Sequence, residues 1–380
     1  MVLALVGGTV LTMEGPVYSP GTVLIKDGKI CGVGERLPLP PEAEVLDVTG
    51  KVVMPGLVEA HCHLGILEEI YRIEGNDLNE ISDPVTPHLR ALDAVNPEDE
   101  GFKDALAAGI TTVLTGPGSA NVIGGQTLVM KTHGTVVDKM VLRQPAGLKV
   151  AFGENPKRVH GEQQKKQPAT RMAITALLRE QLVKAQNYLK KLSREEGERD
   201  LRLEPLVQVL RKEIPLQAHV HRADDIMTAL RIAGEFQLDL ILVHCTEGHK
   251  VVEELARYNV PVIVGPTLTS RSKVELKERT FRTPALLSKA GVKVALMTDH
   301  PVIPVQYLPL CAALAVKEGM AEEEALKAIT LYPAQILGVA HRVGSIAPGK
   351  DADIIVASGS LLDLKSRVEM VLVNGEVVVS

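Results

Sequence analysis

Histidines at the ends of apolar runs are the side chains in this sequence best suited to chemistry. His61 and His63 close the apolar run that begins at Met54, and Cys62 stands between them. In an extended strand, residues two apart face the same side, so both imidazoles point into one space while Cys62 points away. Two converging imidazoles at a strand end are typical of a divalent metal site.

The same pattern recurs farther along the chain. His219 and His221 close a second apolar run, His244 closes a third, and Asp299 follows a fourth. Each run predicts a strand that ends in a side chain able to bind a metal. Neutral imidazoles with one carboxylate suit a divalent ion such as zinc, with iron or manganese as alternatives.

A barrel would bring these four strand ends together. Between the two ends of the chain, apolar runs alternate with helical patterns, as in parallel βαβ units. Strands are expected to end near His61, Thr115, Gly153, His219, His244, Gly265 and Asp299, with an eighth in the stretch 121–142. Eight units predict an α/β protein with a (β/α)8 TIM barrel, whose C-terminal strand ends all meet at one face. A doubly wound open sheet is the alternative.

The two ends of the chain have a β-rich character that the middle lacks. Asp27-Gly28 and Asn374-Gly375 stand between short β-rich runs and predict hairpin turns. Because chain termini often lie close together, both ends are expected to form one small β-sandwich domain. The predicted domains are therefore 1–50 with 345–380 for the β-sandwich, and 51–344 for the barrel.

Composition excludes several classes of protein. The chain has 380 residues, of which 45% are hydrophobic and 23% charged, as in ordinary globular proteins. A net charge of -5 provides no basic surface for nucleic acid. No apolar run reaches the ~18 residues that a membrane span needs, and the apolar start, Met1 to Leu11, is expected to be a strand and not a signal peptide. Four scattered cysteines predict a reducing, cytoplasmic setting, and a homo-oligomer stays open.

Taken together, these motifs resemble those of the amidohydrolase superfamily, in its imidazolonepropionase-like and prolidase-like branch. The resemblance covers nearly the whole chain and rests on residues 55–63, 219–221, His244, Thr298-Asp299 and 344–353. It implies a barrel with a split β-sandwich, one or two divalent metals, and hydrolysis by water. It also implies a ligand set, which is His61 and His63 on the first strand, His219 on the fifth, His244 on the sixth and Asp299 on the eighth.

Two positions stay open under this resemblance. Relatives with two metals have a carboxylated lysine on the fourth strand, which Lys149 would match, whereas others use a glutamate, for which Glu154 is the candidate. Strand alternation favours Lys149, and without its modification a one-metal site is the alternative. His221 could replace His219 as a ligand, because both are expected to face inward.

The expected reaction is hydrolysis of a carbon-nitrogen bond in a small-molecule substrate: a cyclic amide, an N-acyl amino acid or a dipeptide. The metal would lower the pKa of water to roughly 7, and Asp299 would accept the proton and deliver it to the departing nitrogen. His221 or Arg222 could stabilise the developing anion, and Arg222 also suits a substrate carboxylate. Thr269 and Arg271 leave the seventh strand on the same face and are expected to touch substrate.

Two other functions compete with hydrolysis. Deaminase branches pair the fifth-strand histidine with a glutamate three residues later, where this chain has Arg222, so deamination is weakened. A catalytically silent barrel could serve as a scaffold, but the retained ligand positions argue against it. Substrate choice is expected to depend on the loops 64–95 and 266–280, and the loop histidines His88, His133, His160 and His341 are expected at the surface.

Overall fold

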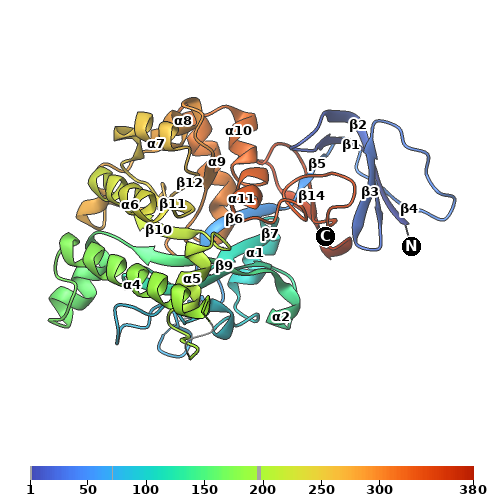
Figure 1. Cartoon of the computed structure of the whole chain (residues 1–380). Coiled ribbons are helices and arrows are strands. Elements are labelled where there is room, and N and C mark those ends of the chain that lie inside the picture. The colour runs from blue at the N-terminus through green and yellow to red at the C-terminus, as the bar shows by residue number, and fades with distance from the viewer. Residues whose placement is uncertain (1, 71, 195–197) are drawn as a thin grey trace.

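The computed structural model describes residues 2–70, 72–194 and 198–380, which form two eight-stranded sheets. In Figure 1 a barrel surrounded by helices lies on one side, and the sheet that contains both chain ends lies on the other. Among the described residues, no helix has the length and apolar character that crossing a membrane requires.

The sheet that contains both chain ends is built from the two ends of the sequence, as predicted. Its strand order is β16-β15-β14-β5-β1-β2-β3, with β4 paired to β1. The strands are β1 Val2–Leu11, β2 Val17–Lys26, β3 Lys29–Gly34, β4 Glu44–Asp47, β5 Val52–Pro55, β14 Ile354–Ala357, β15 Val368–Val373 and β16 Glu376–Val379. Asp27-Gly28 and Asn374-Gly375 form the two tight hairpin turns, all with positive φ between 51° and 77°. The sheet includes β5, just beyond residue 50, and the domain boundaries stay a prediction.

The first sheet closes into the predicted barrel. Its order is β13-β12-β11-β10-β9-β8-β7-β6, and β13 returns to contact β6. The strands are β6 Leu57–Cys62, β7 Ile110–Thr115, β8 Ile123–Lys131, β9 Val141–Ala151, β10 Leu216–Val220, β11 Leu240–His244, β12 Val262–Val264 and β13 Val294–Leu296. This closed order excludes the open doubly wound sheet.

One barrel strand differs from the all-parallel prediction. β8 is the strand expected in 121–142, but it pairs antiparallel with both β7 and β9. The connection 116–122 is too short for a crossover helix, since a parallel connection needs about a dozen residues or more. β8 therefore starts at the face where β7 ends and runs back to the opposite face.

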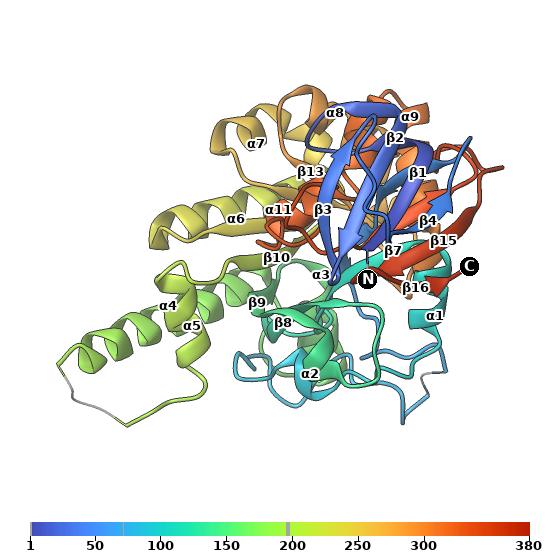
Figure 2. The same ribbon diagram turned by 90° about the vertical axis from the view of Figure 1, so that its right-hand side faces the viewer.

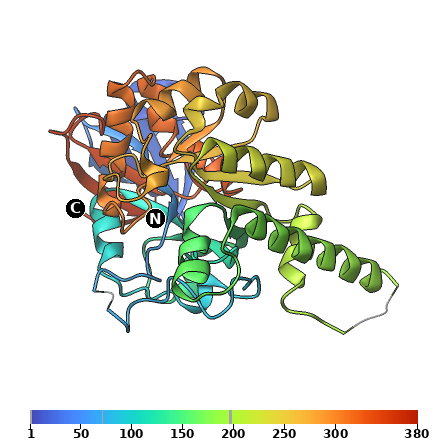
Figure 3. The same cartoon turned by 90° about the vertical axis from the view of Figure 1, so that its left-hand side faces the viewer.

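Helices surround the barrel and cover its outer surface. They are α1 Gly101–Ala107, α2 Val137–Met140, α3 Glu154–Pro156, α4 Arg171–Leu192, α5 Glu204–Leu210, α6 Ala223–Phe236, α7 Val252–Tyr258, α8 Arg282–Lys289, α9 Leu308–Lys317, α10 Glu322–Lys327 and α11 Leu331–Ile336. Short turns of other helix types are η1 Ala91–Asp93, η2 Lys157–Gln163, η3 Gly248–Lys250, η4 Val274–Leu276 and η5 Val305–Tyr307, of which η2 is a π-helix. Figures 2 and 3 show the long helix α4 projecting from the body beside α6.

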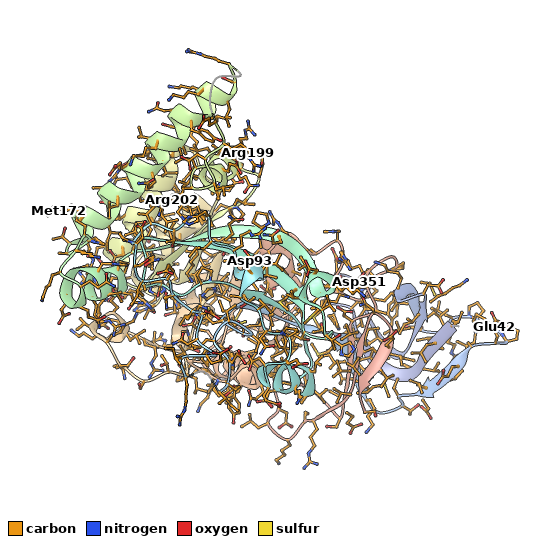
Figure 4. The ribbon with its side chains drawn as sticks, turned by 90° about the horizontal axis from the view of Figure 1, so that it is seen from below. Glu42, Asp93, Met172, Arg199, Arg202 and Asp351 are labelled. Atoms are coloured by element: carbon orange, nitrogen blue, oxygen red, sulfur yellow. The ribbon has the colours of Figure 1, made fainter. Side chains whose placement is uncertain are left out.

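A buried ion-pair network joins the barrel to the sheet of the termini. Lys131, the last residue of β8, lies 2.8 Å from Asp351 and 2.9 Å from Asp353. Burial alone would raise the pKa of Asp351, but hydrogen bonds from Lys131, Lys29 and Arg342 outweigh it and lower the pKa to about 2. Figure 4 shows Asp351 at the junction between the two sheets. Because β8 runs antiparallel, it places the Lys131 ammonium beside the carboxylates of Asp351 and Asp353.

Candidate metal centre

Five histidines, one aspartate and one lysine gather at one end of the barrel. His61 lies in β6, Lys149 in β9, His219 in β10 and His244 in β11. His63 and His221 directly follow β6 and β10, and Asp299 follows β13. All seven side chains are buried. Asp299 Oδ1 lies 3.5 Å from His61 Nε2 and 3.4 Å from His63 Nε2. The ring centres of His219 and His244 are 4.3 Å apart, and those of His221 and His244 are 4.5 Å apart.

Two overlapping groups in the described part of the chain could each hold a metal ion. One is His219, His221 and His244, and the other is His61, His244 and Asp299. Within each group the possible ligand atoms lie within 4.8 Å of one another. His244 belongs to both groups, so the two positions are adjacent.

Hydrogen bonds fix which ring nitrogen faces the centre. His63 Nδ1 lies 2.7 Å from the carbonyl oxygen of Gly116, and His244 Nδ1 lies 2.8 Å from that of Gly265. A carbonyl oxygen can only accept, so in both rings Nδ1 carries the hydrogen, and Nε2 of the neutral ring offers its lone pair to the centre. Orientation of a histidine through its other nitrogen is the usual arrangement in metal sites.

A hydroxyl group, which can donate or accept, orients His221. Its Nδ1 lies 2.7 Å from Thr246 Oγ1, while its Nε2 is buried and has no hydrogen-bond partner. The buried Nδ1 of His219 and Oδ1 of Asp299 also have no hydrogen-bond partner. Buried polar atoms without partners are costly in a folded protein unless a ligand satisfies them, so this donor set fits a cation.

The pKa values describe neutral imidazoles around an ionised carboxylate. Burial lowers the pKa of His61, His219 and His221 well below the usual value, and lowers the pKa of His244 to about 3. Burial alone would raise the pKa of Asp299, but the neighbouring His244 and His63 outweigh it and lower the pKa. These are the protonation states in which histidine and aspartate bind metals.

The backbone is unusual at two of these residues. His244 and Asp299 have left-handed conformations, with φ of 74° and 56°. Such conformations are uncommon outside glycine, cost free energy and are found most often at functional sites. The strained turns after β11 and β13 aim both side chains into the barrel mouth.

Lys149, and not Glu154, reaches the centre. Lys149 Nζ lies 2.8 Å from His61 Nε2, and the residue is 1% exposed. Burial lowers the pKa of its amine to about 8, although the charge of Asp299 acts in the opposite direction. Glu154 begins α3, beyond the end of β9, and does not line the central cavity. The alternation along β9 predicted that Lys149 faces inward, and the structure places its amine beside His61.

Glu59 is a buried site residue that the sequence analysis missed. Its carboxylate accepts hydrogen bonds from the backbone nitrogen and hydroxyl of Thr298, at 3.0 and 2.8 Å, and from the backbone nitrogen of His61, at 3.2 Å. Burial raises its pKa to about 8. Glu59 thus ties β6 to the turn that carries Asp299, and a carboxylate two residues before His61 was its only signal in the sequence.

The centre lies at the base of a cavity of about 630 Å³. His221 and Thr269 line it, as predicted, but Arg222 and Arg271 do not. The Arg222 guanidinium donates two hydrogen bonds to the Asp224 carboxylate, at 2.9 and 2.8 Å, at the exposed start of α6. Arg271 donates to the carbonyl oxygen of Lys277 at 2.8 Å within its own loop. The guanidinium groups of both arginines thus donate to acceptors outside the cavity.

His160 is also placed differently from the expectation that it lies at the surface. It is fully buried in the π-helix η2, and its Nε2 lies 2.8 Å from Asn121 Oδ1. Asn121 donates in turn to Thr86 Oγ1 at 2.9 Å. This network connects η2, the start of β8 and the loop 64–95, all of which border the cavity mouth.

A sequence profile of the amidohydrolase family matches residues 52–378. This chain belongs to the amidohydrolase family. The predicted resemblance is therefore confirmed. The family is metal-dependent, in agreement with the histidine and aspartate groups of this amidohydrolase.

Individual relatives cover nearly all of this amidohydrolase. It is 30% identical to the amidohydrolase tasK of Hapsidospora irregularis over 93% of its length, but spans only 39% of that larger protein. It is 25% identical to an imidazolonepropionase of Porphyromonas gingivalis, over 92% of this chain and 85% of that one. A crystal structure of an amidohydrolase from Thermotoga maritima superposes with a TM-score of 0.96, at 47% identity and 99% coverage of both chains. Deaminases and prolidases also occur among the similar proteins, so the comparisons do not determine the substrate.

Proposed function

We propose that this amidohydrolase is a metal-dependent enzyme that hydrolyses a carbon-nitrogen bond of a small substrate: a cyclic amide, an N-acyl amino acid or a dipeptide. One observation carries the proposal. Neutral imidazoles, oriented through their outer nitrogens, converge with the ionised Asp299 at the base of a substrate-sized cavity. Three of the five rings, those of His63, His221 and His244, have this orienting bond.

We propose two ion positions, with zinc as the metal and iron or manganese as alternatives. His61, His63 and Asp299 would hold one ion, and His244 with His219 or His221 would hold the other. Imidazole and carboxylate ligands suit all three metals. Lys149 lies between the two sets, beside His61, and its amine would serve as a ligand after carboxylation.

Carboxylation of Lys149 has a chemical basis in its surroundings. Only an unprotonated amine adds carbon dioxide, forming an N-C bond and releasing one proton. A pKa of about 8 leaves an appreciable fraction of this amine unprotonated at neutral pH. The product is a carboxylate, which the surrounding imidazoles and ions would stabilise.

We expect a labelled carbonyl resonance at Lys149 when the holoenzyme is prepared with ¹³C-bicarbonate and examined by NMR. The Lys149→Met variant should lack this resonance and contain at most about one ion per chain. The control Lys289→Met, on the exposed end of α8, should retain the resonance. A wild-type enzyme with two ions and no labelled carbonyl would contradict the carboxylated lysine.

The proton transfers of the proposed reaction are assigned to the carboxylate of Asp299. A divalent ion at this site would supply Lewis acidity and make hydroxide available from water near pH 7. Asp299, ionised in this environment, would accept the proton of the attacking water. It would then donate that proton to the departing nitrogen as the carbon-nitrogen bond breaks. Where His219 serves as the ligand, the Thr246 hydroxyl would donate to His221 Nδ1, and the N–H group at His221 Nε2 would donate to the substrate oxygen on which negative charge develops.

The setting and partners are part of the same proposal. All four cysteines are free, which favours a reducing compartment such as the cytoplasm. We propose a small molecule as the partner, with no role for nucleic acid or a membrane. A homo-oligomer is compatible with this function.

The function is tested with N-acyl amino acids, dipeptides and lactams, assayed with added zinc or manganese. We expect hydrolysis of at least one class, its loss after chelation, and its recovery when the metal is restored. A protein that holds no metal and hydrolyses nothing in the panel would support the silent scaffold. Ammonia release from aminopurines, without hydrolysis of any amide, would identify a deaminase instead.

A further inference from the structure

In the described part of the chain, the charged residues that line the catalytic cavity outside the metal centre are all positive. Apart from the residues of the metal centre, its charged lining residues among those described are Arg158 and Lys273. Asp299 is the only carboxylate in that described lining, and the proposed mechanism uses it as the base. A substrate group that binds beyond the metal centre therefore meets cations and no acid.

Lys273 lies close to the proposed reaction centre. Its Nζ donates to Asn155 Oδ1 at 3.3 Å, and Asn155 Nδ2 lies 3.4 Å from His219 Nε2. One amide group thus separates the ammonium from a metal-centre imidazole, a spacing that suits the two ends of a small amino-acid derivative. Asn155 is itself fixed by a bond of 2.7 Å to Ser119 Oγ.

The charge of Lys273 is only partly neutralised within the protein. Glu275 forms an ion pair with Lys273 at 3.5 Å, and it shares its charge with the Arg171 guanidinium at 3.3 Å. The Lys273 side chain keeps 20% of its surface exposed, at a cavity-lining position. The ammonium can therefore still donate to a bound anion.

Arg158 lines the same cavity and follows Asn155 by three residues in the sequence. It belongs to the π-helix η2, an uncommon conformation that often occurs at functional sites. The buried bond between His160 and Asn121 holds this turn in place. Arg158 is exposed and forms no ion pair among the described residues, so its guanidinium is available to a ligand.

The rest of the cavity has an uncharged lining that combines polar with apolar side chains. Its hydrophobic lining consists of Leu67, Leu78, Val159, Leu276 and Val302. These side chains suit an uncharged acyl group or an apolar amino-acid side chain. A free ammonium group in this cavity would find the catalytic Asp299 as its only carboxylate partner in the described lining and would lie near Lys149 and Lys273.

We infer that the substrate is an N-acyl amino acid whose carboxylate is bound by Lys273 and Arg158. This inference rests on the proposed hydrolase function and selects one of its three substrate classes. Water adds its oxygen to the acyl carbon, the carbon-nitrogen bond breaks, and the nitrogen takes up a proton, so the products are a carboxylic acid and a free amino acid. Zwitterionic dipeptides are disfavoured by their ammonium group, and neutral lactams lack the anion.

The first test compares N-acetylleucine with N-acetylleucinamide, which lacks the negative charge. Lys273→Met and Arg158→Gln should each lower kcat/KM for the acid by about 10- to 100-fold, mainly through KM, because a hydrogen bond to a charged group is lost. The same variants should change kcat/KM for the amide by less than about 2-fold. The exposed controls Lys277→Met and Arg282→Gln should behave as the wild type with both compounds. Equal losses for the acid and the amide would overturn the inference.

The second test measures binding without turnover. N-Methanesulfonyl-leucine carries the same carboxylate, but its sulfonamide resists hydrolysis. Calorimetry should show that it binds the metal-loaded wild type at least about 10-fold more tightly than Lys273→Met. Equal affinity for both proteins would overturn the carboxylate site, even in an active hydrolase. Charge-dependent binding in a protein that hydrolyses no amide would instead leave the carboxylate site standing and reject the proposed function.

The dipeptide glycylleucine completes the comparison. Its α-ammonium group should lower kcat/KM at least about 10-fold relative to N-acetylleucine, since the described lining offers it no acid except Asp299. Faster cleavage of the dipeptide than of the N-acetyl compound would overturn the choice of substrate class.

Discussion

Replacing Asp299 with asparagine is expected to lower kcat by about 10²- to 10⁴-fold while leaving most of the bound metal in place. The asparagine side chain has nearly the shape of aspartate and tolerates the left-handed backbone at this position. Its amide oxygen can still accept a hydrogen bond, but it cannot take up the proton of the attacking water. The loss should therefore appear in turnover and not in protein folding. Steady-state kinetics and metal analysis of the same preparation measure the two effects.

Asp363→Asn, a change in the exposed loop before β15, is the matched control and should leave kcat unchanged. Two outcomes would contradict the role of Asp299. Asp299→Asn could retain its turnover, which would exclude the carboxylate as the base. It could instead lose its metal together with its activity, which would reduce Asp299 to a ligand.

The strand ends were predictable because they depend on local pattern. An apolar run followed by histidine or aspartate predicts both a strand and the end of the barrel at which it finishes. The strands β6, β10 and β11 end within one residue of their predicted positions. The selection of Lys149 over Glu154 followed from alternation along β9. These properties extend over a few neighbouring residues and need no knowledge of the rest of the fold.

The direction of β8 was not predictable in the same way. Its sequence is that of a buried strand, and such a strand can run in either direction. Direction was set by the short connection 116–122 and by the cation at its far end, since Lys131 meets the carboxylates of Asp351 and Asp353. These partners lie more than two hundred residues away in sequence, so no local pattern indicated them.

The two arginines that were predicted to contact the substrate show a second limit of sequence reasoning. Position in a loop gives the location of a backbone but not the direction of a long side chain. Arg222 and Arg271 lie in the expected segments, yet each finds an acceptor in its own neighbourhood and turns away from the cavity. Lys273, two residues after Arg271, points inward because Asn155 accepts its hydrogen bond. The nearby acceptor, and not the residue type, decided which cation reached the cavity.

Replacing His244 with asparagine is expected to remove the ion that His244 would hold with His219 or His221, because Nε2 is the one nitrogen of the His244 ring that is free to bind a metal. The ion assigned to His61, His63 and Asp299 should stay in place. Asparagine is the suitable replacement since its side chain tolerates the left-handed backbone, with φ of 74°, and it is a poor zinc ligand. Loss of a directly bound ligand should weaken metal affinity more than the roughly 10- to 100-fold typical of outer-sphere changes. Metal content after dialysis, measured by mass spectrometry of the eluted ions, should fall from about two ions to about one per chain.

Two matched variants make this expectation specific. His219→Asn leaves the group His61, His244 and Asp299 intact, so it should retain about one ion per chain. His249→Asn removes a histidine outside both candidate groups, whose Nδ1 lies 2.9 Å from Thr283 Oγ1, and it should keep the full metal content. If His244→Asn loses both ions while His219→Asn keeps one, the assignment of His244 to a single ion is wrong. The ion beside Asp299 would then depend on His244 as well as on His61 and His63.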